Sequence, residues 1–267
     1  MIEIVRNHFE RGHVRFAVFD FDGTLSLIRE GWQEVMASAM LAELLKTPDH
    51  EPEPELRHFL ADLVTQTTGQ TTSYQMTCLA AEVRKRGDPP QDPLVYKQRY
   101  LARLGERIGQ RVAALKAGRA TPDDMMVPGS REILEDLRMR GVRSYLVSGT
   151  YEPYLLDETK VLDVAAYFDG IYGAQDDPNR FSKRQFLERF IAERRLRGHE
   201  WVSIGDGITE IKEAKRMGGI AVGVASNEVE RIGMNERKRN LLIEAGADII
   251  VPDFREHEEL VAYLLDE

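Results

Sequence analysis

The sequence contains a single cysteine, Cys78, among its 267 residues. One thiol can form neither an intrachain disulfide nor a cysteine-based metal cluster, so both are excluded. Apolar runs are also short, and none approaches the ~18 residues that suggest a transmembrane helix. The first residues, Met1–Asn7, lack the basic and then apolar layout of a signal peptide. These absences predict a cytoplasmic protein that does not span a membrane.

Positive charge is scarce relative to negative charge. The chain has 36 lysines and arginines against 45 aspartates and glutamates, which gives a net charge of −9 at pH 7. Proteins that bind nucleic acid or anionic membranes usually present a basic face, so we expect neither as a partner. With 42% hydrophobic residues, the length allows one large domain or a core domain that carries a smaller insertion.

Short apolar segments recur along the chain and predict the strands of a sheet. They lie at Val14–Phe19, Val142–Val147, Trp201–Ile204, Ile220–Val224 and Ala247–Val251. Between the later ones, two segments have helical spacing: Ser130–Gly141, which begins at a capping serine, and Ile208–Met217, which precedes two glycines. Alternating strands and helices predict an α/β fold, with a Rossmann-like parallel sheet covered by helices on both faces.

The first two predicted strands are separated by far more residues than one crossover connection needs. Helical patterns fill this interval, at Gly31–Leu45, Glu55–Val64, Tyr74–Arg86 and Leu94–Ala117. We therefore expect an all-helical cap domain at residues 29–126, inserted after the first strand of an α/β core formed by residues 1–28 and 127–267. Hinges between the two are expected near Leu27–Gly31 and Asp123–Gly129.

Polar residues directly follow three of the predicted strands. They are Asp20-Phe-Asp22-Gly-Thr24, Ser148-Gly-Thr150 and Gly205-Asp206-Gly207, and Lys183 opens a helix between the second and the third. Because ligands of parallel sheets bind at the carboxyl ends of the strands, these residues should share one crevice. The adjacent carboxylates need a cation, and Mg²⁺ suits an oxygen-only site that is shared with a phosphate. Lysine, serine and backbone N–H groups would bind the phosphate oxygens.

These four segments resemble, in order, the motifs of the haloacid dehalogenase superfamily in its phosphatase branch. Asp20-x-Asp22-Gly-Thr24 is similar to the first motif, DxDGT, and Ser148 follows apolar residues as in the second. Lys183 matches the third motif, and Gly205-Asp206-Gly207-Ile-Thr-Glu210 resembles the fourth. A helical insertion between the first two motifs resembles the C1-type cap of the phosphoglycolate phosphatase-like group.

The resemblance implies a role for each motif residue. Asp20 would attack phosphorus and form an aspartyl-phosphate, and Asp22 would act as general acid and then as general base. Mg²⁺ would be held by Asp20, by the backbone carbonyl of Asp22 and by Asp206. The expected catalytic residues are Asp20, Asp22, Ser148 and Lys183, and the expected phosphate-binding residues are Gly23, Thr24, Ser148, Gly149 and Lys183.

Some of these residues have simpler explanations when each is taken alone. Ser148 fits a helix cap, Asp206 fits a turn between two glycines, and Lys183 fits an exposed lysine. Glu210 either belongs to the outer coordination sphere of the metal or only favours its helix N-terminus through the dipole. The second carboxylate, Asp22, favours phosphoryl chemistry, because the dehalogenase branch lacks it.

A neutral polar segment, Thr65–Gln75, lies between two predicted cap helices and has no charged residue. Neutral donors and acceptors suit the hydroxyls of a sugar or polyol. Candidate specificity residues are therefore Thr68, Gln70, Thr71 and Gln75. The alternative is an ordinary loop in which Thr72 or Ser73 caps the next helix.

The function that these features favour is a Mg²⁺-dependent phosphatase for a small phosphorylated metabolite, such as a sugar or polyol phosphate or a compound like phosphoglycolate. A phosphomutase of the same superfamily would keep every motif, and a non-catalytic binding domain on this fold is a further alternative. A nuclease is disfavoured by the acidic charge. The six histidines show no metal-ligand spacing, and neither the substrate nor the oligomeric state follows from the sequence.

Overall fold

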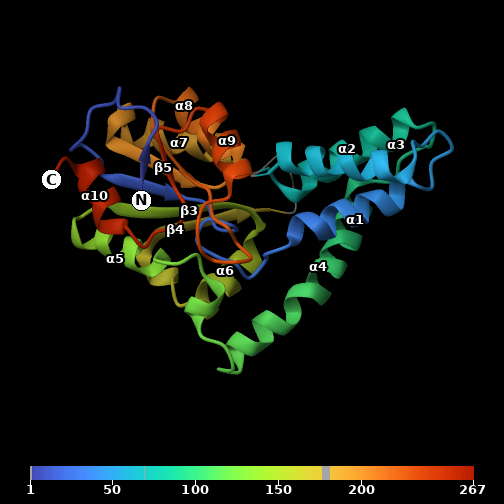
Figure 1. The fold of residues 1–267 in the computed structure, drawn as a ribbon, viewed down its shortest axis with the longest axis horizontal. Coiled ribbons are helices and arrows are strands. Elements are labelled where there is room, and N and C mark those ends of the chain that lie inside the picture. The colour runs from blue at the N-terminus through green and yellow to red at the C-terminus, as the bar shows by residue number, and fades with distance from the viewer. Residues whose placement is uncertain (1, 69, 176–180) are drawn as a thin grey trace.

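The computed structural model describes residues 2–68, 70–175 and 181–267 (Figure 1). Their strands form one sheet in the order β1-β7-β6-β5-β2-β3-β4. The strands are β1 Glu3–Ile4, β2 Phe16–Phe19, β3 Arg143–Tyr151, β4 Phe168–Ala174, β5 Trp201–Gly205, β6 Ile220–Val224 and β7 Ile249–Val251. Neighbouring strands from β7 to β4 run parallel, and β1 pairs antiparallel with β7 at the edge. The predicted α/β fold is confirmed, with this antiparallel edge strand added.

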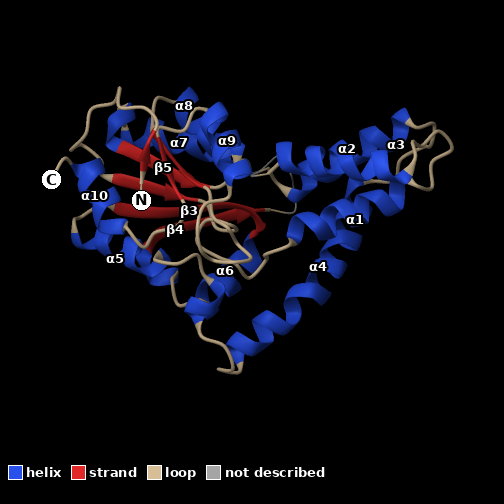
Figure 2. Cartoon of the chain, viewed as in Figure 1, coloured by secondary structure: helices blue, strands red, loops and turns tan. Residues whose placement is uncertain are grey.

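Helices cover both faces of the sheet (Figure 2). They are α5 Ser130–Met139, α6 Glu152–Val161, α7 Lys183–Arg194, α8 Ile208–Arg216, α9 Glu236–Ala245 and α10 His257–Leu265, with 3₁₀ turns η1 Pro122–Met125, η2 Ala165–Tyr167 and η3 Gly198–Glu200. The alternation of side chains along β2 explains the two layers. Phe16 and Val18 share a buried cluster with α7, α8 and α9, whereas Ala17 and Phe19 share one with α5 and α10.

Two strands and the N-cap residue of one helix differ from what the sequence predicted. The edge strand β4 was not predicted, because its sequence has two glycines and an aspartate in place of a continuous apolar run. The two-residue β1 is too short to show a pattern. Ser130 does not cap α5: Gly129 is the N-cap residue, at φ 79°, and the Ser130 hydroxyl donates to the Leu25 carbonyl at 3.4 Å.

Four helices lie between β2 and β3 and project to one side of the sheet (Figure 1). They are α1 Trp32–Leu44, α2 Glu53–Gln66, α3 Thr72–Lys85 and α4 Pro93–Lys116, each within two residues of its predicted bounds. Their inward faces are apolar, with Met36, Leu60, Leu79 and Leu104 all buried. None of the described helices is long and apolar enough to cross a membrane.

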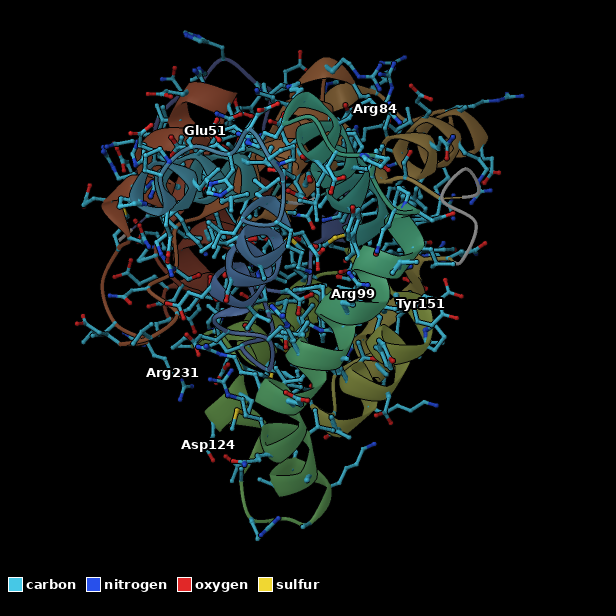
Figure 3. The ribbon with its side chains drawn as sticks, turned by 90° about the vertical axis from the view of Figure 1, so that its right-hand side faces the viewer. Glu51, Arg84, Arg99, Asp124, Tyr151 and Arg231 are labelled. Carbon is cyan, nitrogen blue, oxygen red and sulfur yellow. The ribbon has the colours of Figure 1, made fainter. Side chains whose placement is uncertain are left out.

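The chain passes between the sheet and these four helices twice, and the two passages lie side by side. The Leu27 N–H donates to the Met125 carbonyl at 2.8 Å, and the Val127 N–H donates to the Leu25 carbonyl at 3.0 Å. Arg231, from the loop after β6, donates to the Met126 carbonyl at 3.1 Å and lies next to η1, as the neighbouring labels Arg231 and Asp124 show (Figure 3). The two passages thus form a hydrogen-bonded pair, and Arg231 from the loop after β6 forms a further hydrogen bond to one of them.

Candidate active site

Three central strands bring the predicted motifs together. Phe19 at the end of β2 pairs with Leu146 of β3 on one side and with Ile204 of β5 on the other. The carboxyl ends of these strands therefore meet at one edge of the sheet. Asp20 and Asp206 follow β2 and β5 there, whereas Ser148 lies near the carboxyl end of β3, which runs longer than the sequence predicted; all three are buried.

Lys183 lies in the first turn of α7 and reaches this edge. Ser182 caps the helix, since its hydroxyl accepts the Gln185 N–H at 3.1 Å. The Lys183 ammonium contacts Asp20 Oδ1 at 2.7 Å and also contacts Glu210 Oε1. Burial alone would lower the pKa of Lys183, but the two carboxylates outweigh it and raise the pKa. These ion pairs offset the unfavourable position of a cation at a helix N-terminus.

The carboxylates at this site exceed what Lys183 can neutralise. Burial, aided by the charges of Glu210 and Asp206, raises the pKa of Asp20 to about 8 in spite of the adjacent ammonium. Glu210 Oε2 is buried and has no hydrogen-bond partner among the described residues. The arrangement therefore favours a further cation.

Asp22 has one bound and one free carboxylate oxygen. Its Oδ2 accepts a hydrogen bond of 2.6 Å from the Thr150 hydroxyl. Its Oδ1 is buried without a hydrogen-bond partner in the described part of the chain and lies 3.8 Å from Nε of Arg29. Burial is the largest cause of the raised pKa of Asp22 and exceeds the opposing effect of Arg29. A carboxyl group that holds its proton more tightly than usual is suited to act as a general acid.

Arg29 is a buried cation that the motifs did not predict. It follows the apolar pair Leu27 and Ile28 and forms two hydrogen bonds to Glu158 of α6, Nη2 to Oε1 at 2.6 Å and Nε to Oε2 at 3.1 Å. Only 7% of its surface is exposed. In the sequence Arg29 only follows a short apolar pair and precedes Glu30, and this context does not identify its partner.

A second cation comes from outside the predicted motifs. Lys238, in α9, contacts Asp206 Oδ2 at 2.7 Å and Glu228 Oε1 at 2.6 Å. No pattern near Lys238 in the sequence distinguishes it from the other charged residues of its helix, so sequence analysis missed it. Its charge balances part of the excess of carboxylates.

Two of the residues predicted to bind phosphate have other contacts. The Thr24 hydroxyl is buried and accepts the Asp206 N–H at 3.0 Å, which joins the first motif to the fourth. Gly23 has φ +75° and lies against Asp206, where a Cβ atom would collide with Oδ2. Its carbonyl accepts a hydrogen bond of 2.8 Å from Ser226. Both residues position Asp206, and their phosphate contacts stay a prediction.

The second motif lies directly beneath the helical insertion. The Ser148 hydroxyl accepts the Thr150 N–H at 3.1 Å. A Cβ atom on Gly149 would lie 2.7 Å from the Gln70 carbonyl oxygen, so only glycine permits this close approach. Gly149 therefore sets the distance between the sheet edge and the loop before α3.

A cavity of about 60 Å³ opens between the sheet edge and the insertion. Its lining includes Asp20, Asp22, Ser148, Gly149, Thr150, Lys183 and Asp206 from the predicted segments, and Arg29, Trp32, Thr72 and Tyr100, which were not predicted to lie there. Charged and polar side chains from the core motifs and from the insertion both line it. The motif residues thus share one small, partly open cavity.

The predicted specificity loop meets this cavity, although Gly69 within it lies outside the described residues. Thr68, Gln70 and Gln75 line the cavity. Gln70 Nε2 donates to the Thr209 hydroxyl of α8 at 3.0 Å, across the gap between the insertion and the sheet side. Thr71 instead caps α3, because its hydroxyl accepts the Tyr74 N–H at 3.2 Å.

The donors at this site suit a divalent cation. The acidic side chains that line it, Asp20, Asp22 and Asp206, offer only oxygen donors, and hard cations such as Mg²⁺ prefer oxygen ligands. A bound cation would also compensate the negative charge here. Asp22 and Glu210 each have a buried oxygen without a hydrogen-bond partner among the described residues, and the pKa of Asp20 is raised. The residues present therefore fit a metal of this class.

Solved structures with a similar fold include several phosphatase-titled proteins. One is a predicted phosphoglycolate phosphatase from Haemophilus somnus 129PT, 17% identical, with a TM-score of 0.59 over 93% of this chain and 98% of that one. Another is a predicted phosphatase from Clostridium acetobutylicum, 18% identical, with a TM-score of 0.59 and the same coverage. A beta-phosphoglucomutase from Clostridium difficile is 12% identical, with a TM-score of 0.55 over 86% and 98%. At these identities the similarity shows a common fold.

The family follows from a comparison of the sequence itself. A search of curated proteins finds no significant match. A family model described as haloacid dehalogenase-like hydrolase, however, matches residues 14–218, which is more than half of the chain and includes all four motifs. Members of this family generally use a divalent metal. The chain therefore belongs to the haloacid dehalogenase-like hydrolases.

Proposed function

We propose that the protein is a phosphatase that hydrolyses a small phosphorylated metabolite. The observation that carries this proposal is the contact of 2.7 Å between the Lys183 ammonium and Asp20, at a strand end where a second carboxylate, Asp22, follows two residues later. A cation beside a nucleophilic carboxylate suits a substrate with charged phosphoryl oxygens. The phosphatase titles of structures with this fold agree with the proposal.

In the first proposed step, an Asp20 oxygen forms a bond to phosphorus while the bond to the leaving oxygen breaks. Asp22 gives its proton to that oxygen, for which the raised pKa of this carboxyl group is favourable. In the second step, Asp22 removes a proton from water, which attacks phosphorus and frees Asp20. Lys183 and the Ser148 hydroxyl would bind the phosphoryl oxygens throughout.

The metal we propose is Mg²⁺, held by Asp20, the carbonyl of Asp22 and Asp206. When bound, it would neutralise charge on the phosphoryl oxygens. Glu210 would orient Lys183 and accept hydrogen bonds from water in the outer coordination sphere through its free Oε2. Lys238 would neutralise part of the charge of Asp206.

We further propose that residues 29–126 act as a cap domain over a core of residues 1–28 and 127–267. The cavity lies between the insertion and the sheet and is lined by both, so a movement of the insertion would change access to it, which supports a cap that opens to admit the substrate. Thr68, Gln70 and Gln75 would then contact the non-phosphate end of the substrate, and Thr71 would act indirectly by holding the start of α3. Their neutral side chains favour a sugar or polyol, and a cytoplasmic location stays a prediction.

Phosphate release from a panel of phosphate esters tests this proposal. The panel should contain sugar, polyol and glycolate phosphates, nucleotides and phosphorylated amino acids. We expect turnover with Mg²⁺, loss of turnover with EDTA, and recovery when Mg²⁺ is restored. Equal recovery with Ca²⁺ would contradict the octahedral geometry that Mg²⁺ requires. No turnover on any ester would instead support a non-catalytic binding domain.

A phosphomutase is the second candidate, because a beta-phosphoglucomutase shares the fold. Such an enzyme transfers the phosphoryl group back to a sugar and must keep water from the phosphorylated aspartate. A sugar 1-phosphate separates the two functions. A phosphatase releases inorganic phosphate and free sugar, whereas a mutase yields the sugar 6-phosphate with little free phosphate.

A further inference from the structure

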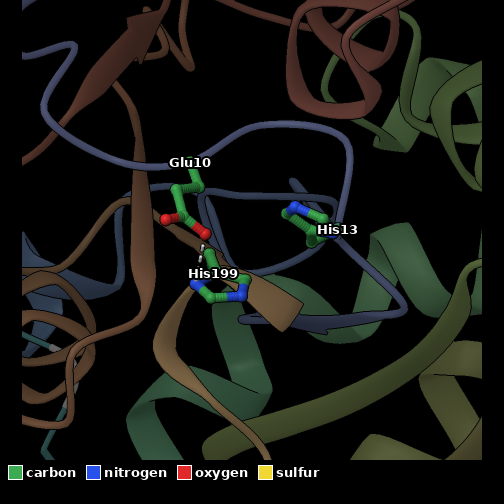
Figure 4. A group of neighbouring side chains, drawn as sticks. All are labelled: Glu10, His13 and His199. Atoms are coloured by element: carbon green, nitrogen blue, oxygen red, sulfur yellow. Dashed lines mark ion pairs between the residues drawn. The ribbon is translucent and has the colours of Figure 1, made fainter.

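Three potential metal ligands meet at the end of the sheet opposite to the cavity. Glu10 and His13 lie in the segment before β2, and His199 lies in η3 just before β5 (Figure 4). The catalytic aspartates follow the carboxyl ends of the same two strands. This cluster is therefore separated from the cavity by the length of the sheet and shares no residue with it.

Backbone pairing brings the two segments together. Phe16 of β2 pairs with Trp201 of β5, and just before them the Arg15 N–H donates to the Glu200 carbonyl at 2.9 Å. The Arg15 side chain also contacts Glu200 at 2.7 Å, so its charge is neutralised and does not repel a cation nearby. The hydrogen bonds between the two backbone segments thus hold the positions from which His13 and His199 extend.

The three side chains face one another. The rings of His13 and His199 lie 5.0 Å apart, centroid to centroid, at an angle of 54°. His199 Nδ1 lies 3.5 Å from Glu10 Oε2, at the limit of a hydrogen bond. One ligand atom from each residue lies within 4.8 Å of the other two. Donors bound to one Zn²⁺ at about 2.1 Å would lie about 3.4 Å apart. Glu10 and His13 are exposed and His199 is half-buried, so rotations of these side chains can close the difference.

The types of donor determine which metal would bind. Two imidazoles and one carboxylate form a set that suits Zn²⁺ and similar first-row transition metals, whereas Mg²⁺ prefers oxygen ligands alone. Three protein ligands leave the fourth position of a tetrahedral ion to water. The cluster is therefore chemically distinct from the oxygen-only site in the cavity.

We propose that Glu10, His13 and His199 bind a divalent transition metal of the Zn²⁺ class. The bound ion would clamp the segment between β1 and β2 onto η3. This segment leaves the sheet at the β1 edge and re-enters at the centrally placed β2, so it must pass the ends of β7, β6 and β5. A clamp next to β5 would restrain it without entering the catalytic cavity.

Cobalt binding to the full-length protein without a histidine tag tests this proposal. The protein is stripped of metal with EDTA, dialysed, and titrated with Co²⁺ in excess Mg²⁺, so that the oxygen-only site stays filled. Visible absorption reports nitrogen coordination of Co²⁺, and thermal unfolding with Zn²⁺ reports the clamp. We expect one Co²⁺ per chain and a rise in Tm with Zn²⁺.

Four variants make the result specific. His13→Gln and His199→Gln should each weaken Co²⁺ binding by at least about tenfold, because even the loss of a group that supports a ligand costs that much. His8→Gln, in the same segment but outside the cluster, and Asp206→Asn, in the cavity, should bind Co²⁺ as the unmodified chain does. Phosphate release by His13→Gln should be unchanged.

Three outcomes would overturn the proposal. One is the absence of Co²⁺ binding in excess Mg²⁺, and another is equal binding by the two histidine variants and the unmodified chain. The third is loss of binding in Asp206→Asn alone, which would place the ion in the cavity. None of these outcomes depends on whether the protein is a phosphatase.

Discussion

The ammonium group of Lys238 lies 2.7 Å from Oδ2 of Asp206, although Asp206 follows β5 and Lys238 lies in α9. Asp206 is the proposed metal ligand of the fourth motif, so α9 places a permanent positive charge beside the metal site. Burial would lower the pKa of Lys238, but Asp206 and Glu228 more than offset this and raise the pKa. The lysine therefore stays charged and competes with a metal for Asp206.

We expect Lys238→Met to lower the Mg²⁺ concentration needed for half-maximal phosphate release by about threefold or more, because a nearby like charge is removed. A Mg²⁺ titration of activity, and one of Tm, measure the change. Lys212→Met, on an exposed face of α8, is the matched control and should leave the titration unchanged. A higher Mg²⁺ requirement would show that Lys238 mainly holds Asp206 in position.

Asp20→Asn should abolish turnover, because an amide is a poor nucleophile and cannot complete the metal site. Phosphate release on the best substrate of the panel measures this, and Tm confirms that the variant folds. Asp157→Asn, at an exposed position in α6, should retain full activity. More than trace turnover by Asp20→Asn would contradict the covalent mechanism.

Asp22→Asn should impair two proton transfers to different degrees. An alkyl phosphate needs the proton for its leaving oxygen, whereas p-nitrophenolate leaves readily without one. We therefore expect turnover to be lost on both substrates, but a burst of p-nitrophenolate to remain, since the first step survives and water attack does not. Rapid-mixing absorbance measures the burst. Its absence, combined with equal losses on both substrates, would argue against Asp22 as the acid.

Glu158→Gln should destabilise the protein, because it leaves the buried guanidinium of Arg29 without its charged partner. Breaking such a pair costs about 3 kcal/mol, which corresponds to a fall in Tm of roughly 6–12 °C. The double variant Arg29→Met with Glu158→Leu should recover most of the loss, since neither charge is then left alone. Equal Tm values for Glu158→Gln and the unmodified chain would show that water or Asp22 compensates the arginine.

Gln70→Ala should raise the KM for the true substrate or reorder the substrate panel, while p-nitrophenyl phosphate should be little affected. The variant avoids Thr71, whose loss would remove the cap of α3 and disturb folding. Gln110→Ala, on the exposed face of α4, is the control. Equal losses of activity on both substrates would indicate that the position of the insertion has changed. Unchanged activity on every ester of the panel would show that Gln70 does not take part in substrate recognition.

Local patterns predicted most of the fold. Buried parallel strands such as β5 and β6 are mostly apolar, and the four inserted helices have clear helical spacing between proline-rich breaks. The edge strand β4 escaped detection because a half-buried edge tolerates its glycines and Asp169. A strand of two residues, such as β1, has no period to detect.

The candidate site was predictable where its residues lie at or just after the carboxyl ends of strands. Asp20, Ser148 and Asp206 occupy positions that the topology of a parallel sheet brings together. Arg29 and Lys238 were not predictable, because their partners come from other elements. An ion pair between residues far apart in the chain produces no recognisable local sequence pattern. The same holds for His13 and His199, which only the register between β2 and β5 brings together.

The paired passages between sheet and insertion also limit how the cap can move. Two single linkers would allow it to swivel freely, but the hydrogen bonds of Leu27 to Met125 and of Val127 to Leu25 make the passages one two-stranded ribbon. Sliding one passage past the other would break both hydrogen bonds, so bending of the pair is the easier motion. We therefore expect the proposed cap to open by rotation about one hinge axis. A single rotation angle would then describe the whole opening movement.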